Sequence, residues 1–149
     1  MSNKEKRIFK KGEVLYVIDC WGTTCGMHAF EASARIIHVD EEIGSFDAVL
    51  YGDTYQRYNV KDYGRLIFDD ESEAKKAAYK LPKPNSYVYQ LIGNRVFEKI
   101  VVGVRNENIN NFTDLVVHLN KGKSVPIGRI GIELFLDESS AREKTRKIN

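Results

Sequence analysis

The sequence predicts an α+β fold made of two tandem β-rich repeats, each ending in a short α-helix. Three observations lead to this prediction: the chain aligns with itself, its apolar residues fall in short runs between turns, and each half ends in a helix-start signal. The 149 residues are 42% apolar and 30% charged, which suits one ordinary domain or two small ones.

The internal repeat appears when the sequence is laid over itself so that Phe30 falls on Phe97, with no gap across residues 30 to 81. Upstream, Val14–Ile18 aligns with Tyr87–Leu91 only at a longer shift. The first half therefore has about six extra residues, close to Cys20–Gly26, between its first two strands. The matched segments are Ala29–Glu31 with Val96–Glu98, Asp47–Leu50 with Asp114–Val117, Gly64 with Gly131, and Phe68–Ala74 with Phe135–Ala141.

We expect four segments along the chain. They are a basic N-terminal arm at residues 1–11, a barrel-like repeat with the inserted hairpin at 12–81, a linker at 82–86, and a second barrel-like repeat at 87–149. Pro82 and Pro84 in the linker stop the preceding helix and favour an extended segment. Repeats this small are marginally stable alone, so we expect them to pack on each other or on a second copy of the chain in a homo-oligomer.

Short runs rich in Val, Ile, Tyr and Phe, separated by Gly, Asn and Asp, predict the strands of each repeat. This spacing is typical of a small barrel or a strongly bent sheet. The predicted strands are 13–19, 28–38, 46–51, 55–60 and 65–68 in the first repeat, and 86–92, 95–105, 112–119, 124–127 and 130–136 in the second.

Each repeat ends in a predicted helix that begins at an aspartate. Asp70 is followed by Glu73, a spacing typical of a helix N-terminus whose side chains cap backbone N–H groups. Small or apolar residues then recur at helical spacing, which predicts short helices lying close against a sheet. The stripes are Ala74, Ala77, Ala78 and Leu81 in the first repeat, and Ala141, Thr145 and Ile148 after Asp137 in the second.

Five short strands in about 60 residues, closed by a helix, resemble the SH3-like small-barrel architecture. The segment Tyr63–Ala77 resembles strand-then-helix endings common in small proteins of phages and mobile elements of Gram-positive bacteria. Such proteins include the anti-CRISPR inhibitors, which act by binding host effector proteins. The resemblance implies a building block, and no activity transfers with it.

Both cysteines and two of the three histidines fall within nineteen residues. Cys20 and Cys25 flank a four-residue turn, and with His28 on the return strand they offer three ligands of a tetrahedral zinc site. His38 would complete the site only if the chain folds back or the site is intermolecular, because ten strand residues span roughly 33 Å. The alternatives for that position are Asp19 and Asp40. A structural Zn²⁺ is one hypothesis for the inserted hairpin, and free thiols in a longer surface hairpin are the other.

A cysteine hydrolase is the enzymatic interpretation of the same cluster, with Cys20 or Cys25 as nucleophile and His28 or His118 as base. A cysteine nucleophile needs an oriented base and an electropositive setting that lowers the thiol pKa, whereas the neighbouring Asp19 would raise it. No serine elbow, phosphate-binding loop, paired metallo-histidine helix or dinucleotide fingerprint occurs in the sequence. We therefore expect that the protein is not an enzyme.

The net charge of +2 is distributed unevenly over three segments of the chain, which are in turn basic, acidic and basic. Residues 1–11 carry five bases and one acid, residues 12–81 seven bases and thirteen acids, and residues 82–149 eleven bases and seven acids. This alternation argues against a uniformly basic nucleic-acid binder and favours a protein partner.

No run approaches the ~18 to 20 apolar residues of a membrane span, and the start lacks the apolar stretch of a secretory signal. We therefore expect no membrane partner and a cytoplasmic protein.

The predicted partner-binding surface is an acidic hairpin of the first repeat with neighbouring tyrosines. A negative surface there would complement the basic nucleic-acid channel of a host effector nuclease and steer association. Tyrosines are enriched at interface hot spots, although alternate strand positions should place about half of them in the core. The alternative is a merely solvated hairpin. The candidate residues are Asp40, Glu41, Glu42, Asp47, Asp53, Tyr51, Tyr55 and Tyr58.

The sequence thus predicts a non-enzymatic protein-binding module, in its sharpest form an anti-CRISPR-type inhibitor of a host nuclease encoded by a phage or mobile element. The alternative is a nucleic-acid-binding small barrel that uses the basic second repeat and both basic ends. That role would require aromatic stacking platforms among the basic residues, and only Phe9 is available. The basic residues concerned are Arg142, Lys144, Arg146 and Lys147 near the C-terminus and Lys4, Lys6, Arg7, Lys10 and Lys11 near the N-terminus.

Overall fold

The computed structural model describes residues 7–23, 26–108 and 111–148. These residues form two compact units, each assembled from separate stretches of the chain. Unit 1 holds residues 7–18, 31–78, 108 and 111–113, and unit 2 holds residues 19–23, 26–30, 79–107 and 114–148. The fold is mostly β-sheet with two α-helices, and none of the described helices is long and apolar enough to cross a membrane.

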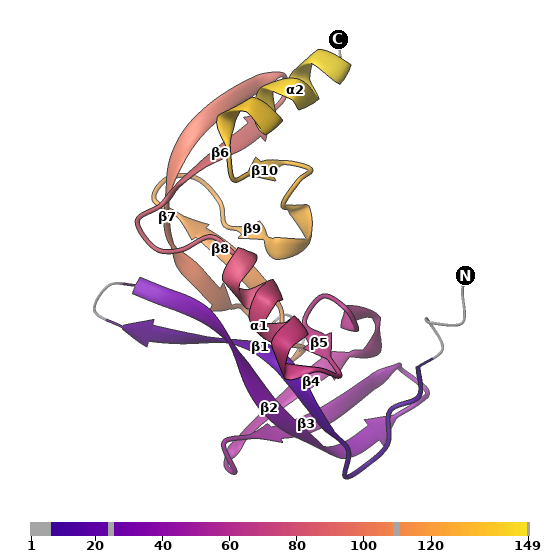
Figure 1. Cartoon of the computed structure of the whole chain (residues 1–149). Coiled ribbons are helices and arrows are strands. Elements are labelled where there is room, and N and C mark those ends of the chain that lie inside the picture. The colour runs from indigo at the N-terminus through magenta and orange to yellow at the C-terminus, as the bar shows by residue number, and fades with distance from the viewer. Residues whose placement is uncertain (1–6, 24–25, 109–110, 149) are drawn as a thin grey trace. The chain divides into compact units, whose positions relative to one another are not determined.

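Each half of the chain has the same order of elements: four strands, a short 3-10 helix, a fifth strand and an α-helix (Figure 1). The first half contains β1 (Val14–Thr23), β2 (Gly26–Asp40), β3 (Ser45–Leu50), β4 (Thr54–Asn59), η2 (Val60–Asp62), β5 (Ile67–Phe68) and α1 (Glu71–Lys80). The second half contains β6 (Tyr87–Ile92), β7 (Arg95–Asn106), β8 (Leu115–Leu119), β9 (Val125–Pro126), η3 (Ile127–Arg129), β10 (Leu134–Phe135) and α2 (Glu138–Ile148).

Unit 1 is built on antiparallel pairs, in which β2 pairs with β3, β3 with β4, and β1 with β5. Along β3 the buried and partly exposed residues alternate, so Phe46 and Leu50 are buried whereas Asp47 is not. The Phe46 ring centroid lies 5.0 Å from that of Phe9 and 5.6 Å from that of Tyr58. This alternation fixes the register of the strands, since a slip by one residue would turn the aromatic core to solvent.

Unit 2 repeats the same pairings: β7 pairs with β8, β8 with β9, and β6 with β10. In addition, β6 pairs with β7. The consecutive residues Leu115, Val116 and Val117 of β8 are all buried, which is typical of a strand covered on both faces. Further fully buried side chains complete this core: Val88, Val101, Val104 and Leu134.

The two halves also pair their strands at corresponding residues. Tyr16 in β1 lies opposite Phe68 in β5, and Tyr89 in β6 lies opposite Phe135 in β10. The self-alignment of the sequence matches Tyr16 with Tyr89 at its longer shift and Phe68 with Phe135 at its shorter one. The alignment therefore relates residues that hold the same place in the sheet.

A glycine closes the turn before the fifth strand of each half. The N–H of Gly64 donates to the carbonyl of Ile67 at 2.8 Å, and the N–H of Gly131 donates to the carbonyl of Leu134 at 2.7 Å. The φ angles of Gly64 and Gly131 are +90° and +91°, a region in which an L side chain is strained. The space that a Cβ atom would occupy is open at both glycines, so backbone conformation alone requires glycine there.

Replacing Gly64 or Gly131 with alanine is expected to lower the free energy of unfolding by about 1–2 kcal/mol in each case. Asparagine tolerates positive φ better than alanine and should cost less at both positions. Urea denaturation of the single variants measures these losses. A loss at only one of the two glycines would contradict a shared turn.

The extra residues of the first half lengthen β1 and β2. The sequence predicts strands that end at residue 19 and resume at residue 28, whereas β1 runs to Thr23 and β2 starts at Gly26. Within unit 2, β2 pairs in parallel with β7, with Met27 opposite Gly103. A strand from the other half of the chain thus supplies backbone partners for this part of β2, which local sequence patterns do not reveal.

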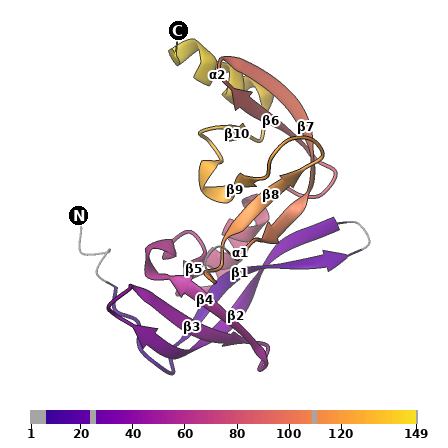
Figure 2. The same ribbon diagram turned by 180° about the vertical axis from the view of Figure 1, so that it is seen from behind.

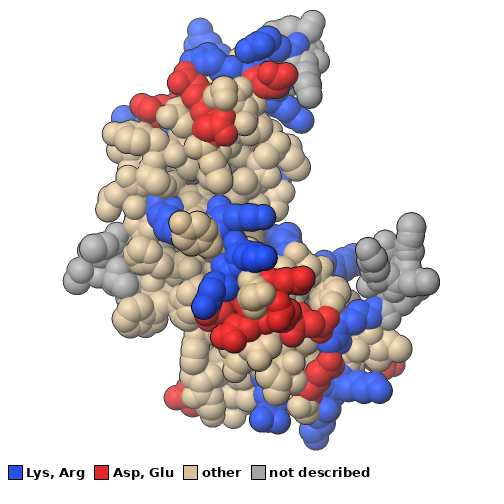
Figure 3. All heavy atoms as spheres, in the orientation of Figure 1, with Lys and Arg blue, Asp and Glu red and all other residues tan. Residues whose placement is uncertain are grey.

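Both helices begin directly after the predicted aspartates and place small residues in the core. The side chain of Asp137 accepts the backbone N–H of Ser140 at 2.8 Å, and this bond holds the pKa of Asp137 below its usual value. Ala74 and Ala78 of α1 and Ala141 of α2 are buried. Figure 3 shows acidic side chains gathered over the start of α1 and basic side chains over its end, an arrangement that complements the helix dipole.

Candidate functional site

Unit 1 presents one solvent-facing surface on the side of β2, β3 and β4 opposite the aromatic core. The three strands lie side by side (Figure 1, Figure 2). Directly opposed residues of antiparallel strands share a face, so two rows of side chains cross this sheet. We call this surface the outer face, and it comprises the row His38, Asp47 and Arg57 and the row Arg35, Val49 and Tyr55.

An ion pair fixes the middle of the outer face. The Nε atom of Arg57 donates to Oδ1 of Asp47 at 2.8 Å, across the β3–β4 register. This hydrogen bond raises the pKa of Arg57, and the more distant carboxylate of Asp40 acts in the same direction. Because the pair joins neighbouring strands, the sheet backbone holds both charges in place.

A surface pocket of about 500 Å³ opens beside this ion pair. A bulge in β2 between Ile36 and His38 adds Ile37 to its wall. The pocket offers one carboxylate, one guanidinium, one phenol and three amides, a set suited to hydrogen bonding and stacking. The lining residues are Ile37, Asp47, Tyr55, Gln56, Arg57, Asn108 and Asn111.

The second half of the chain contributes one wall of the pocket. Within unit 1, Phe112 pairs in parallel with Arg57, and the N–H of Thr113 donates to the carbonyl of Arg57 at 2.8 Å. The Thr113 hydroxyl also donates to Oε1 of Gln56 at 2.8 Å, and Thr113 is buried. These bonds cover the edge of β4, and they anchor the segment that carries Asn111 against the pocket.

The structure places the predicted acidic residues at three separate positions. Asp47 lies in the middle of the outer face, whereas Asp40, Glu41 and Glu42 lie at the β2–β3 turn and Asp53 lies at the β3–β4 turn. Six residues of β3 separate the two turns, which is roughly 20 Å. The carboxylate of Asp40 accepts the backbone N–H groups of Glu42 and Ile43 at 3.1 and 3.3 Å, so it also holds its own turn.

The three predicted tyrosines have different surroundings. Tyr55 is 69% exposed and lines the pocket, and Tyr51 is 57% exposed in the β3–β4 turn with a φ of +58°. Tyr58 has no exposed surface and packs on Phe46 in the core. Of these three tyrosines, Tyr51 and Tyr55 therefore present an aromatic ring that a partner can reach.

The predicted zinc ligands are only partly described by the structure. Cys25 lies outside the described residues. Burial raises the pKa of the Cys20 thiol to about 12, and Asp19 adds to this shift, so Cys20 carries a proton at neutral pH. His28 is half-buried and His38 is exposed. Among the described residues no three His, Cys, Asp or Glu side chains gather to hold a metal ion, and the zinc hypothesis stays a prediction.

The basic residues of the nucleic-acid alternative lie on α2. Arg142 pairs with Glu138 one turn earlier, with its Nε atom 2.8 Å from the carboxylate, and Arg146 lies 3.9 Å from Glu143. Lys144 is half-buried, and nothing is described for the side chain of Lys147. Two of the four predicted cations are therefore partly neutralised on their own helix.

Sequence reasoning missed five residues of the pocket: Ile37, Gln56, Arg57, Asn108 and Asn111. A signal for Arg57 was present, because a hairpin turn at residues 51–53 places Arg57 opposite Asp47 and their charges are complementary. No local sequence pattern predicts that Asn108 and Asn111 lie at the pocket, because they reach this unit from the second half of the chain.

Comparison of the chain with protein-family models, curated proteins and solved structures found no match.

Proposed function

We propose that the protein acts without catalysis, by binding a protein partner through the outer face of unit 1. The observation that carries this proposal is the position of Tyr55, which is 69% exposed beside the Asp47–Arg57 pair in a pocket on a sheet. A tyrosine on a rigid strand offers a large contact area and a polar tip at little cost in conformational entropy. Tyrosine and arginine are also among the side chains enriched at interface hot spots.

The carboxylates in the turns at the two ends of β3 favour a partner with a basic surface. The acids of the β2–β3 turn and Asp53 lie at the two ends of β3, whereas Arg57 is already paired with Asp47. Exposed carboxylates of this kind steer a basic partner during association more than they tighten the complex. The class of partner that we propose is therefore a host protein with a positive, nucleic-acid-binding surface.

An inhibitor encoded by a phage or mobile element, of the anti-CRISPR type, is the sharpest form of this proposal. Its support is the resemblance of the strand-then-helix ending Tyr63–Ala77 and the matching strand registers of the two halves. We assign each half to the SH3-like small-barrel architecture as part of the same proposal.

Affinity capture from a lysate of a Gram-positive bacterium, treated with nuclease, tests the proposed function. We expect the wild-type chain to retain a protein at stoichiometric amounts, and the Tyr55→Ala chain to lose it. Tyr87→Ala is the matched control, because Tyr87 is 56% exposed in unit 2 and lies outside the outer face. This control chain should retain the same protein.

Two outcomes would contradict the proposed function. In the first, the wild-type chain retains nucleic acid and no stoichiometric protein, with binding that weakens steeply as salt rises and depends on Arg142 and Arg146. In the second, Tyr55→Ala and Tyr87→Ala retain the captured protein equally well, which would place the contact surface elsewhere.

A further inference from the structure

In unit 2, the first part of β7 has a free edge. Residues Arg95 to Ile100 pair with β6 on one side, whereas pairing with β8 on the other side begins only at Val101. Among the described strands, none pairs with the second side of β7 between Arg95 and Lys99. An unpaired edge of this kind is a template for an added strand.

Hydrogen bonds at the end of this edge show which backbone groups point outward. The N–H of Val101 donates to the carbonyl of Ser86 on the β6 side. On the other side, the N–H of Ile100 donates to the side-chain oxygen of Asn120, and the carbonyl of Ile100 accepts the N–H of Asn120. Backbone groups alternate in direction along a strand, so those of Val96 and Glu98 point outward with Ile100. The N–H of Leu91, opposite Val96, agrees with this assignment because it donates to Glu133 on the side away from β7.

The first half of the chain shows that the corresponding edge receives a strand. Ala29–Glu31 of β2 aligns with Val96–Glu98 of β7 in the self-alignment of the sequence, so Met27 corresponds to Asn94. At Met27 the edge of β2 pairs in parallel with β7. The position equivalent to Met27, Asn94, lies in the turn directly before β7, and among the described strands none pairs with the outer edge of β7 that follows it.

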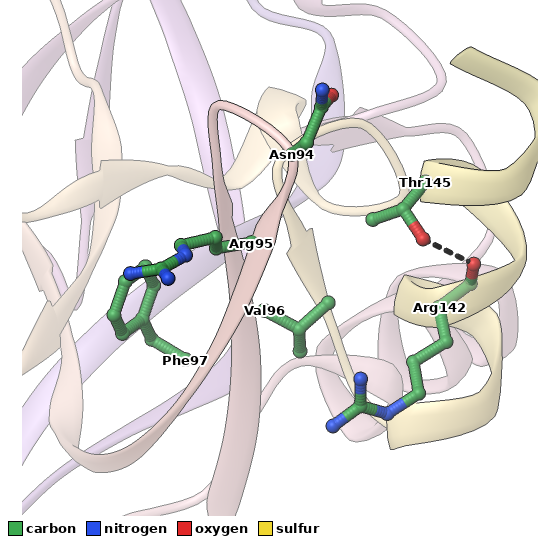
Figure 4. Close-up of a pocket in the computed structure, with 6 residues that line it drawn as sticks. All are labelled: Asn94, Arg95, Val96, Phe97, Arg142 and Thr145. Carbon is green, nitrogen blue, oxygen red and sulfur yellow. Dashed lines mark hydrogen bonds between the residues drawn. The ribbon is translucent and has the colours of Figure 1, made fainter. Parts of the chain in front are cut away.

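Basic side chains lie on both sides of the open edge (Figure 4). Val96 points towards Arg142 and Thr145 of α2, whereas Arg95 and Phe97 lie on the other side of the strand. Together with Asn94 they line a pocket of about 370 Å³. Arg95 has no ion-pair partner among the described residues, and Phe97 is 39% exposed.

We propose that the free edge of β7 binds an extended peptide segment with acidic side chains, which adds as a strand alongside Val96 and Glu98. The backbone bonds would give the peptide its register, and its alternate side chains would reach Arg95 and Phe97 on one face and Arg142, which also pairs with Glu138, on the other. This site is separate from the outer face of unit 1, and it does not depend on the proposed function.

Amide hydrogen exchange of the full chain, followed by NMR, tests the proposal with a defined probe. The probe is a short acetylated and amidated peptide of alternating valine and glutamate. We expect slower exchange at the N–H groups of Val96 and Glu98, and no comparable effect from the analogue in which lysine replaces glutamate.

Two variants separate backbone pairing from charge. Val96→Pro removes one outward N–H while leaving the β6 side intact, which an edge strand tolerates, and it should weaken binding of the glutamate peptide about tenfold. Arg95→Glu reverses the side-chain charge and leaves the backbone N–H and carbonyl groups in place, and it should also weaken binding about tenfold. Equal binding to wild type and Val96→Pro would overturn the proposal, as would equal binding of the lysine peptide, or unchanged exchange at Val96 and Glu98.

Discussion

Replacing Tyr58 with alanine is expected to lower the free energy of unfolding by about 3–5 kcal/mol, the usual cost of deleting a buried aromatic ring. Tyr58 has no exposed surface, and its ring centroid lies 5.6 Å from that of Phe46. Removal of the ring would leave a cavity beside Phe46 that the surrounding β-sheet closes only in part. Urea denaturation followed by circular dichroism measures the loss.

Tyr55→Ala is the matched control for this prediction, because Tyr55 lies three residues earlier on the same strand and is 69% exposed. Its replacement should change the free energy of unfolding by less than about 0.5 kcal/mol. A loss at Tyr55 as large as the loss at Tyr58 would show that the outer face of unit 1 is part of a core, and would contradict its role as a free surface.

Replacing Arg7 with alanine is expected to cost about 1–3 kcal/mol of folding free energy, because one side chain joins several groups. The Arg7 guanidinium donates to the carboxylates of Glu13 and Asp69, with its Nε atom 3.0 Å from Asp69 Oδ1. It also lies 4.4 Å from the ring centroid of Phe9 and 5.4 Å from that of Tyr63. Arg7→Lys should recover only part of the loss, because an ammonium cannot form the same fork of hydrogen bonds.

The contribution of Arg7 should depend on pH in the acid range. Hydrogen bonds from Arg7 hold the pKa values of Glu13 and Asp69 below their usual values. A carboxylate with a lowered pKa in the folded state stabilises the fold above its unfolded pKa of about 4, and this stabilisation is lost as pH falls through the folded pKa. The difference in unfolding free energy between wild type and Arg7→Ala should therefore shrink below about pH 4.

Lys11→Ala is the matched control for the Arg7 variant, since it removes an exposed positive charge from the same arm. Urea denaturation at neutral and acid pH should show almost no effect of this change at either pH. If Arg7→Ala and Lys11→Ala behave alike, the ion-pair account of the N-terminal arm is wrong.

Much of the architecture follows from local patterns in the sequence. The self-alignment of the sequence relates strand positions correctly. It matches Tyr16 with Tyr89 and Phe68 with Phe135, and in the sheets Tyr16 lies opposite Phe68 while Tyr89 lies opposite Phe135. The helix starts follow from the aspartates that precede them and from the small-residue stripes, which are short-range signals. The sequence predicts longer strands at 65–68 and 130–136, whereas β5 and β10 have two residues each. Turns occupy the residues just before these short strands: the N–H of Leu66 donates to the carbonyl of Asp62, and the N–H of Glu133 donates to the carbonyl of Arg129. The apolar composition of these turns does not distinguish them from strands.

The candidate site was less accessible to sequence reasoning. Asp47 and Tyr55 were predicted and lie together in the pocket, because period-two alternation assigns faces within one hairpin. The sequence-based surface also includes Tyr58, but the same alternation from Tyr55 places Tyr58 on the opposite face, in the core. Asn108 and Asn111 reach the pocket through pairing between segments far apart in sequence. Such long-range pairing depends on the whole fold and leaves no local signal.

The binding affinity of the captured partner for the two matched tyrosine variants tests the central claim most directly. Isothermal titration of the purified partner should show binding to Tyr55→Ala about 30-fold weaker than to wild type, the effect of losing an interface hot spot. Tyr87→Ala should bind within about twofold of wild type, because Tyr87 belongs to unit 2. Wild-type affinity in the Tyr55→Ala chain, or the same loss in both variants, would contradict the outer face of unit 1 as the binding surface.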